Sequence, residues 1–416
     1  MVSAVLFITF FVLLVLNVPI SVCLGLSSAA AILYSGTSLT IVATNIYSGI
    51  SKFLLLAIPF FVLSGNIMAK AGISTRLIRF VDTCVGHRKG GIANVCIIVA
   101  CFFGAISGSG PATVAALGAV LIPAMVERGG FSAAFSTALM ATSSSIAIVI
   151  PPSIAFVVYA SITGVSIGDM FMAGIIPGIL MGLALIIVVM LEVRRDHVVP
   201  SNVEKASAKE RWNAFKDAFW GFLMPVIILG GIYGGIFTPT EAAAVSVVYG
   251  LFVGMVIYKE VKFKDLWEIL IDSAKTTGGI MLIVACASLF SFVCTRFGIS
   301  TAASELLARV AGNQFTFLLI CNIIFLIAGC FIDANSAMYI FIPIMLPVCK
   351  ALGYNVIAFG IMATVNLAIG QVTPPVGVNL FVAIGVKLKN GLQVTLQQIS
   401  RAVVSMVVAS IAVLLL

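Results

Sequence analysis

The chain is a succession of long apolar stretches without charge, and this pattern decides what it can fold into. Its first charged side chain is Lys52, so residues 1–51 contain no Lys, Arg, Asp or Glu. A helix that spans a bilayer needs ~20 mainly apolar residues. Apolar residues make up 61% of the 416 residues and charged residues 9%, against ~25% charged in an ordinary soluble domain. The sequence therefore predicts an all-α, polytopic membrane protein embedded in a lipid bilayer.

The remaining composition excludes several classes of function. The nine cysteines are scattered through apolar stretches without a Cys-x-x-Cys pair, and the two histidines are His87 and His197. The sequence offers no nucleophile–base set, no metal-ligand cluster and no Walker A loop, so we do not expect an enzyme. The net charge of +8 fits positively charged cytoplasmic loops. No basic patch interleaved with aromatic residues is present to bind a nucleic acid.

Three charge-free runs are too long for one membrane span. Residues 90–126, 129–168 and 351–386 comprise 37, 40 and 36 residues, and each run is interrupted in its middle by Gly, Ser, Thr or Pro. Irregular backbone cannot face lipid, because each unsatisfied N–H or C=O group there is destabilising by several kcal/mol. The interruptions must therefore be buried in protein or line a wet cavity.

The two halves of the chain resemble each other. Gly104 matches Gly329 at an offset of 225, and Pro151-Pro152 matches Pro374-Pro375 at an offset of 223. Further matches on both sides drift only from 226 to 223, which indicates an ancient duplication with small deletions.

The charges suggest how the two repeats are oriented. Lys and Arg residues flank run 90–126 on both sides, which predicts a re-entrant hairpin that enters from the cytoplasm. Run 129–168 then crosses as a broken helix. In the second half, 315–349 is expected to be a hairpin from the outside, and the broken helix 355–386 delivers Lys387 and Lys389 to the cytoplasm. Inverted repeats with discontinuous helices are typical of secondary transporters.

These assignments divide the chain into five parts. Between the repeats, Trp212, Phe215 and Phe219 give the hydrophilic segment an amphipathic pattern that is expected to lie at the membrane surface. The predicted parts are N-terminal scaffold helices (1–52), repeat 1 (53–191), an amphipathic cytoplasmic linker (192–217), scaffold helices of the second half (218–275) and repeat 2 (276–416).

The first interruption has the chemistry of a cation site. Hydroxyls and unwound carbonyls are hard oxygen ligands that suit Na⁺, and a helix that starts near Pro111 offers N–H groups to an anion. A close-packed crossing of small residues is the alternative. The broken helix of the same half leaves carbonyls free before its prolines. The predicted first Na⁺ site comprises Ser107, Ser109, Thr113, Ser145, Ile150 and Pro151.

The second hairpin tip contains an ionisable group in an otherwise uncharged stretch. Intramembrane carboxylates such as Asp333 are functional candidates by default, although Asp333 can also cap a helix through the N–H groups of residues 335 and 336. The predicted second Na⁺ site comprises Gly329, Asp333, Gly370, Thr373 and Val376. Between the two sites we expect an anionic substrate, bound by Ser107, Ser109, Ser153, Asp333, Asn335 and Ser336.

Other charged residues favour structural roles. Thr238-Pro-Thr-Glu241 has the pattern of a helix capping box, so Glu241 is expected to cap a helix. Arg296 and Arg309 could meet a substrate carboxylate, but we expect them to be flanking anchors.

Five segments resemble one family closely. They are Gly104-Ala-Ile-Ser-Gly-Ser-Gly-Pro-Ala-Thr-Val-Ala-Ala-Leu-Gly118, Ile150-Pro-Pro-Ser153, Pro177-Gly178, Gly234-Gly-Ile-Phe-Thr-Pro-Thr-Glu-Ala-Ala-Ala244 and Gly370-Gln-Val-Thr-Pro-Pro-Val-Gly377. Over its full length the chain resembles the large membrane subunit (M) of tripartite ATP-independent periplasmic (TRAP) transporters. The resemblance implies Na⁺-coupled import of an organic acid, of the C4-dicarboxylate or sialic acid class, across a bacterial inner membrane with two or more coupling ions.

The resemblance also implies partners and a mechanism. A small membrane subunit (Q), expected as a separate chain or one cut away, and a soluble periplasmic substrate-binding protein (P) would assemble with this chain. The hairpins and broken helices would slide as a unit against the scaffold, as in an elevator. A stand-alone Na⁺/carboxylate symporter of similar architecture is the main alternative, and a membrane enzyme for lipid-linked groups or a channel is disfavoured.

Overall fold

The computed structural model describes residues 1–195, 205–386 and 394–415, and it is helical in both halves of the chain. The first half consists of α1 (Val2–Val15), α2 (Ile20–Tyr34), α3 (Thr40–Ile50), the short 3-10 helix η1 (Phe53–Leu56), α4 (Ala57–Lys70), α5 (Ile73–Val85), α6 (Gly91–Ser107), α7 (Gly110–Glu127), α8 (Ala133–Ser145), the short 3-10 helix η2 (Ile146–Ile148), α9 (Ile154–Thr163) and α10 (Ile167–Arg195).

The second half repeats much of this order. It consists of α11 (Ala208–Tyr233), α12 (Pro239–Phe252), the π-helical turn η3 (Val253–Ile257), α13 (Asp265–Arg296), α14 (Ile299–Val310), α15 (Gln314–Phe331), α16 (Ala334–Ala351), α17 (Val356–Gly370), α18 (Val378–Ile384) and α19 (Leu396–Leu414). No strand occurs among the described residues, so the predicted all-α class is confirmed for that part of the chain.

The helices have the length and surface of membrane spans. Nine of those in the described residues are long and apolar enough to cross a bilayer. Large apolar side chains remain on the outside of the molecule; Ile176 on α10 is 68% exposed and Val226 on α11 is 62% exposed. Such side chains are stable only against lipid or a partner helix, so the chain is a multi-pass membrane protein.

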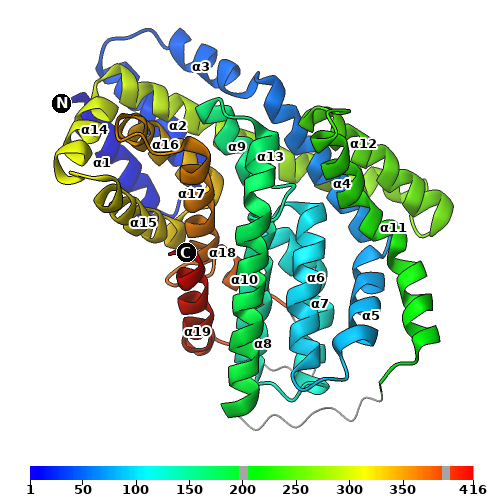
Figure 1. Ribbon diagram of the computed structural model, residues 1–416. Coiled ribbons are helices and arrows are strands. Elements are labelled where there is room, and N and C mark those ends of the chain that lie inside the picture. The colour runs from blue at the N-terminus through cyan, green and yellow to red at the C-terminus, as the bar shows by residue number, and fades with distance from the viewer. Residues whose placement is uncertain (196–204, 387–393, 416) are drawn as a thin grey trace.

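The elements of the two repeats lie side by side around the middle of the molecule. In Figure 1, α6, α7, α8 and α10 stand in the centre, α15 to α19 lie on one side, α5 and α11 lie on the other, and α3 runs across the top. Helix α13 packs against α2, α3 and α4 and also against α16, so it contacts both halves.

Both predicted hairpins and both predicted broken helices are present as helix pairs. Helices α6 and α7 form the first hairpin and α15 and α16 the second. Helix α8 is separated from α9 by the Pro151-Pro152 segment, and α17 from α18 by the Pro374-Pro375 segment. Proline breaks the helix there because it lacks an N–H group and its ring clashes with the preceding turn. The face from which each hairpin enters the membrane stays a prediction.

Helices occupy both ends of the predicted linker 192–217. Helix α10 continues to Arg195, and α11 begins at Ala208. The start of α11 is fixed by a capping box in which Ser207 and Glu210 bond each other's backbone N–H. Trp212 and Phe219, 57% and 40% exposed, therefore belong to the first turns of a long helix. Residues 196–204, and also Lys387 and Lys389, lie outside the described residues.

Candidate functional site

The tip of the first hairpin is a two-residue turn. Helix α6 ends at Ser107, Gly108 adopts φ +60, and Ser109 is extended before α7 begins at Gly110. Only glycine adopts this left-handed conformation without strain. A Cβ atom added to Gly108 would lie 2.7 Å from the Pro152 carbonyl oxygen. The first tip is therefore packed directly on the first break.

Three residues of the predicted first Na⁺ site meet at this tip. The hydroxyls of Ser107 and Thr113 are 2.8 Å apart. The Thr113 hydroxyl donates to the Ser109 carbonyl oxygen at 2.8 Å, and the Ser107 hydroxyl donates to the same oxygen at 3.3 Å. Several hard oxygen atoms thus converge on one turn of uncharged backbone, which is the donor chemistry that a small cation requires.

The first break contributes its residues in a different way. The Ser145 hydroxyl donates to the Thr142 carbonyl oxygen at 2.8 Å within its own helix. The Ser153 hydroxyl donates to the Ile148 carbonyl oxygen at 2.5 Å and accepts the Phe156 N–H at 3.4 Å, so it caps α9. Ile150 and Pro151 lie in the irregular segment between the helices. A helix cap thus accounts for the position of Ser153.

The second hairpin tip is organised by Asp333. This residue is the N-cap of α16, and its carboxylate accepts the N–H groups of Asn335 at 3.0 Å and Ser336 at 3.1 Å. The Ser336 hydroxyl donates to the other carboxylate oxygen at 2.5 Å. The side-chain oxygen of Asn335 is buried and has no hydrogen-bond partner among the described residues. Asp333 is therefore a helix cap, with a neighbouring oxygen left free.

The second tip and the second break are joined through backbone. A Cβ atom added to Gly329 would lie 2.9 Å from the Gly370 Cα atom. The N–H groups of Val376 and Gly377 donate to the Cys330 carbonyl oxygen at 3.3 and 3.2 Å. The Thr373 hydroxyl donates to the Ile369 carbonyl oxygen at 2.7 Å. Four of the five residues predicted for the second Na⁺ site, Gly329, Gly370, Thr373 and Val376, thus lie where α15 meets the break after α17.

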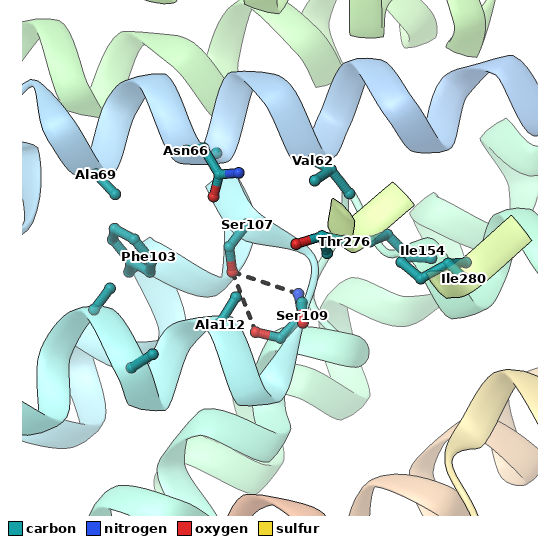
Figure 2. A pocket seen from close by; sticks show the side chains of 13 residues that line it. Val62, Asn66, Ala69, Phe103, Ser107, Ser109, Ala112, Ile154, Thr276 and Ile280 are labelled. Carbon is teal, nitrogen blue, oxygen red and sulfur yellow. Dashed lines mark hydrogen bonds between the residues drawn. The ribbon is translucent and has the colours of Figure 1, made fainter. Parts of the chain in front are cut away.

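A cavity opens between the first hairpin tip and two other helices. Its volume is about 330 Å³. Figure 2 shows Ser107 and Ser109 on one wall and Asn66 and Thr276 facing them from α4 and α13. The cavity is lined by Val62, Gly65, Asn66, Ala69, Phe103, Ser107, Ser109, Ala112, Ala115, Ala116, Ile154, Thr276 and Ile280. None of these described residues carries a charge.

Sequence reasoning did not find Asn66 or Thr276. Asn66 stands in an apolar part of α4, where a polar side chain is expected to face protein or water. Thr276 lies between Lys275 and Thr277 on α13, so its sequence gave no such signal. The Asn66 amide donates to the Ser273 hydroxyl at 2.8 Å, which ties α4 to α13 beside the cavity.

The predicted substrate residues come from three elements. Ser107 and Ser109 line the cavity, whereas Ser153 caps α9. Asp333, Asn335 and Ser336 lie at the start of α16, in the second hairpin. They thus lie at the two hairpin tips and at the first break, and their joint binding of a substrate stays a prediction.

The expectation that Glu241 caps a helix is confirmed, whereas the role expected of Arg296 stays a prediction. The Glu241 carboxylate accepts the Thr238 N–H at 2.8 Å, and the Thr238 hydroxyl accepts the Glu241 N–H at 3.3 Å, so the capping box is formed. The Arg296 guanidinium lies 6.0 Å from the centre of the Phe292 ring on the preceding turn. No group of three or more His, Cys, Asp or Glu side chains that could hold a metal ion occurs in the described parts of the chain.

Comparison with solved structures supports the fold. The Alcanivorax borkumensis YdaH transporter superposes with a TM-score of 0.61 over 90% of this chain and 85% of that one, at 16% sequence identity. At this identity the likeness shows a shared architecture and nothing about the transported molecule.

Comparison of sequences shows the family. Residues 7–416 match the model of the tripartite ATP-independent periplasmic transporter, DctM component. The C4-dicarboxylate TRAP transporter large permease protein DctM of Rhodobacter capsulatus is 39% identical over 390 residues, covering 90% of this chain and 88% of that protein. The sialic acid TRAP transporter large permease protein SiaM of Vibrio cholerae is 36% identical over 354 residues, covering 85% and 82%. The chain therefore belongs to the DctM family, the large membrane subunits of TRAP transporters.

Proposed function

We propose that this chain is the permease of a Na⁺-coupled importer of an organic acid in a bacterial inner membrane. The observation that carries the proposal is the cavity of about 330 Å³ at the first hairpin tip. Its size lies at the lower end of the range for small-molecule sites, and its wall is mostly apolar with a few hydroxyl and amide groups, as such sites usually are. A cavity of this volume is large enough for a small organic acid.

The lack of charge in the cavity wall supports coupling to Na⁺. A carboxylate that enters an uncharged, partly buried cavity loses its hydration, which is strongly unfavourable without a compensating positive charge. The described lining residues include no Lys, Arg or His. The start of α7 supplies a partial positive charge, and Na⁺ bound at the oxygen-rich tips supplies the remainder. Anion and cation then favour each other's binding, which is the basis of symport.

The packing beside the cavity supports movement of the hairpin relative to α4. A Cβ atom added to Gly65 on α4 would lie 3.3 Å from the Ser107 Cα atom, and the facing wall of α7 presents Ala112, Ala115 and Ala116. Small side chains interdigitate little, so such a surface offers few obstacles to sliding. This supports an elevator mechanism in which the hairpins and broken helices travel together against α4 and α13.

The family supports two protein partners. We propose that a periplasmic binding protein delivers the acid and that a small membrane subunit assembles with this chain. The alternative is a stand-alone Na⁺/carboxylate symporter. Relatives named for C4-dicarboxylate and for sialic acid are 39% and 36% identical to this chain. Because these identities are so similar, they do not select the acid, and transport has to be measured for both classes.

Reconstitution in liposomes tests the proposal. Uptake of labelled C4-dicarboxylates and of sialic acid should be measured with the cognate binding protein and small subunit, under an inward Na⁺ gradient, under equal Na⁺, and under a proton gradient without Na⁺. Uptake is expected only with the Na⁺ gradient and the binding protein. Na⁺-driven uptake without either partner would establish the stand-alone symporter, and uptake in Na⁺-free buffer would overturn the coupling.

A pair of matched variants tests the cavity. Asn66→Leu removes the amide beside Ser107 and fills space in the cavity, so uptake should fall at least tenfold. Asn45→Leu is the control, because the Asn45 amide bonds only to the Ile41 carbonyl oxygen of its own helix, at 2.9 Å. Equal uptake by both variants would remove this cavity from the transport route.

A further inference from the structure

Side chains of the second repeat pack against the first hairpin at the start of α7. Gly110, the first residue of α7, is buried. A Cβ atom added to it would lie 2.7 Å from Asn379 Nδ2, 3.0 Å from Asn379 Oδ1 and 3.1 Å from Gln371 Oε1. Gln371 follows α17, and Asn379 lies in the first turn of α18. Two amide groups of the second break therefore converge on one point of the first hairpin.

The oxygen atoms of these amides are buried and unpaired. Gln371 is 5% exposed and Asn379 is 0% exposed. Gln371 Oε1 and Asn379 Oδ1 have no hydrogen-bond partner among the described residues. Asn379 Nδ2 makes a long contact of 3.5 Å to the Ala141 carbonyl oxygen. A buried polar atom without a partner is destabilising by about 1–3 kcal/mol, so two together call for a ligand that donates hydrogen bonds.

The adjoining helix end carries the complementary groups. Ser109 is the N-cap residue of α7, and its side chain makes no capping hydrogen bond. Pro111, the second residue of the helix, has no N–H group. The N–H groups of the first turn are thus donors at the positive end of an 18-residue helix. Donors at the start of α7 and acceptors on Gln371 and Asn379 therefore lie at the same junction.

We propose that this junction binds a water molecule that joins the two repeats. The water accepts a hydrogen bond from the uncapped start of α7 and donates to Gln371 Oε1 and Asn379 Oδ1, which gives it the three partners typical of buried water. Water both accepts and donates hydrogen bonds, so one molecule satisfies the N–H groups of the helix start and both amide oxygens. The site does not depend on what the neighbouring cavity carries.

The repeat pattern makes this site asymmetric. At the offset of 223 that relates Pro151 to Pro374, Gln371 corresponds to Ile148 and Asn379 to Phe156. The first break is apolar at both positions, so a water-bridged junction exists on one side only.

A double-mutant cycle on the purified full chain tests the proposal without any transport assay. Gln371→Met and Asn379→Leu each remove one acceptor at nearly constant volume. If water bridges the amides, each change removes one hydrogen bond of the water and lowers the melting temperature by roughly 2–4 °C, the shift expected for a lost hydrogen bond. The melting temperature of the double variant should then fall by less than the sum of the two single decreases. Unchanged or raised melting temperatures would show a dry junction and overturn the proposal.

Two controls keep the result specific. Asn366→Leu removes another buried amide, one that donates to Asn322 in the second hairpin, and its effect should add to that of Gln371→Met. If Gln371→Met does not fold, Asn379→Leu alone carries the test, and an unchanged or raised melting temperature of that variant contradicts the site. A penalty that appears only in Na⁺-containing buffer would identify the ligand as a cation and overturn the assignment to water.

Discussion

Gly370 and Gly329 touch through their backbones: a Cβ atom added to Gly370 would lie 2.5 Å from the Gly329 Cα atom. The second hairpin and the second broken helix are therefore in direct backbone contact at this crossing. The first half repeats the arrangement less closely, since a Cβ atom added to Gly104 would lie 2.7 Å from the Ala147 Cα atom. Small residues at such crossings let membrane helices approach closely. Gly329 and Gly370 thus allow tight packing and also belong to the predicted second Na⁺ site.

The crossing predicts the effect of one added methyl group. Gly370→Ala should lower the free energy of unfolding by about 1–3 kcal/mol, the usual effect of overpacking, and should abolish transport because the predicted second Na⁺ site is pushed open. Gly312→Ala is the control, since nothing lies within 4 Å of a Cβ atom there. Melting temperature and uptake should be measured together. A Gly370→Ala variant that melts and transports normally would show that the crossing accommodates an added methyl group.

Hydroxyl removal at the first tip tests the predicted first Na⁺ site. Ser107→Ala and Ser109→Ala should each raise the Na⁺ concentration for half-maximal uptake by roughly tenfold, as expected when one ligand worth ~1.4 kcal/mol is lost. Both residues line the cavity, so the substrate response has to be titrated as well. Ser246→Ala removes a buried hydroxyl that bonds only within α12, to the Ala243 carbonyl oxygen at 2.6 Å, and should leave the Na⁺ response unchanged.

The sequence predicted the hairpins and breaks because their causes are local. Gly108 and the two Pro-Pro pairs disrupt helices through their own backbone chemistry, and the Thr238–Glu241 capping box lies within four consecutive residues. The duplication strengthened each assignment, since every break occurs twice. Such features do not depend on how distant segments pack.

The cavity and the junction between repeats could not be predicted in this way. Asn66 and Thr276 reach the first hairpin from α4 and α13, and Gln371 and Asn379 reach it from the second repeat. Nothing in their local sequence distinguishes them from polar residues that simply bond within a helix. The same limit applies to Ser153, whose hydroxyl was predicted to bind substrate and is engaged in capping α9.

Thr373→Val tests the predicted second Na⁺ site with little change of shape. The Thr373 hydroxyl donates to the Ile369 carbonyl oxygen at 2.7 Å, and its loss should lower stability by only ~1 kcal/mol. If its oxygen is also a Na⁺ ligand, the half-maximal Na⁺ concentration should rise about tenfold. Thr364→Val is matched to it, because the Thr364 hydroxyl donates to the Gly360 carbonyl oxygen on the same helix at 2.7 Å. Equal Na⁺ responses of the two variants would exclude Thr373 as a ligand.

Asp333 and Glu241 are both helix caps, so a comparison of their variants separates the effect of losing a cap from the effect of losing a Na⁺ ligand. Asp333 accepts the N–H groups of Asn335 and Ser336, and Glu241 accepts that of Thr238. Asn is as good an N-cap as Asp, so Asp333→Asn should keep the melting temperature close to that of the parent chain. If the charge of Asp333 serves the predicted second Na⁺ site, the same variant should nevertheless lose most of its uptake at saturating Na⁺.

Glu241→Gln should behave in the opposite way. Gln can replace Glu in a capping box, but without the charge that favours the helix N-terminus, so stability should fall by about 0.3–1 kcal/mol while uptake per folded molecule is retained. Asp333→Ala completes the set, because it removes both the cap and the charge and should lower stability and uptake together. If Asp333→Asn transports normally while Asp333→Ala melts early, Asp333 is a cap and nothing more. The predicted second Na⁺ site would then have to be formed by the hydroxyl of Thr373 and the backbone carbonyls around Gly329 and Gly370.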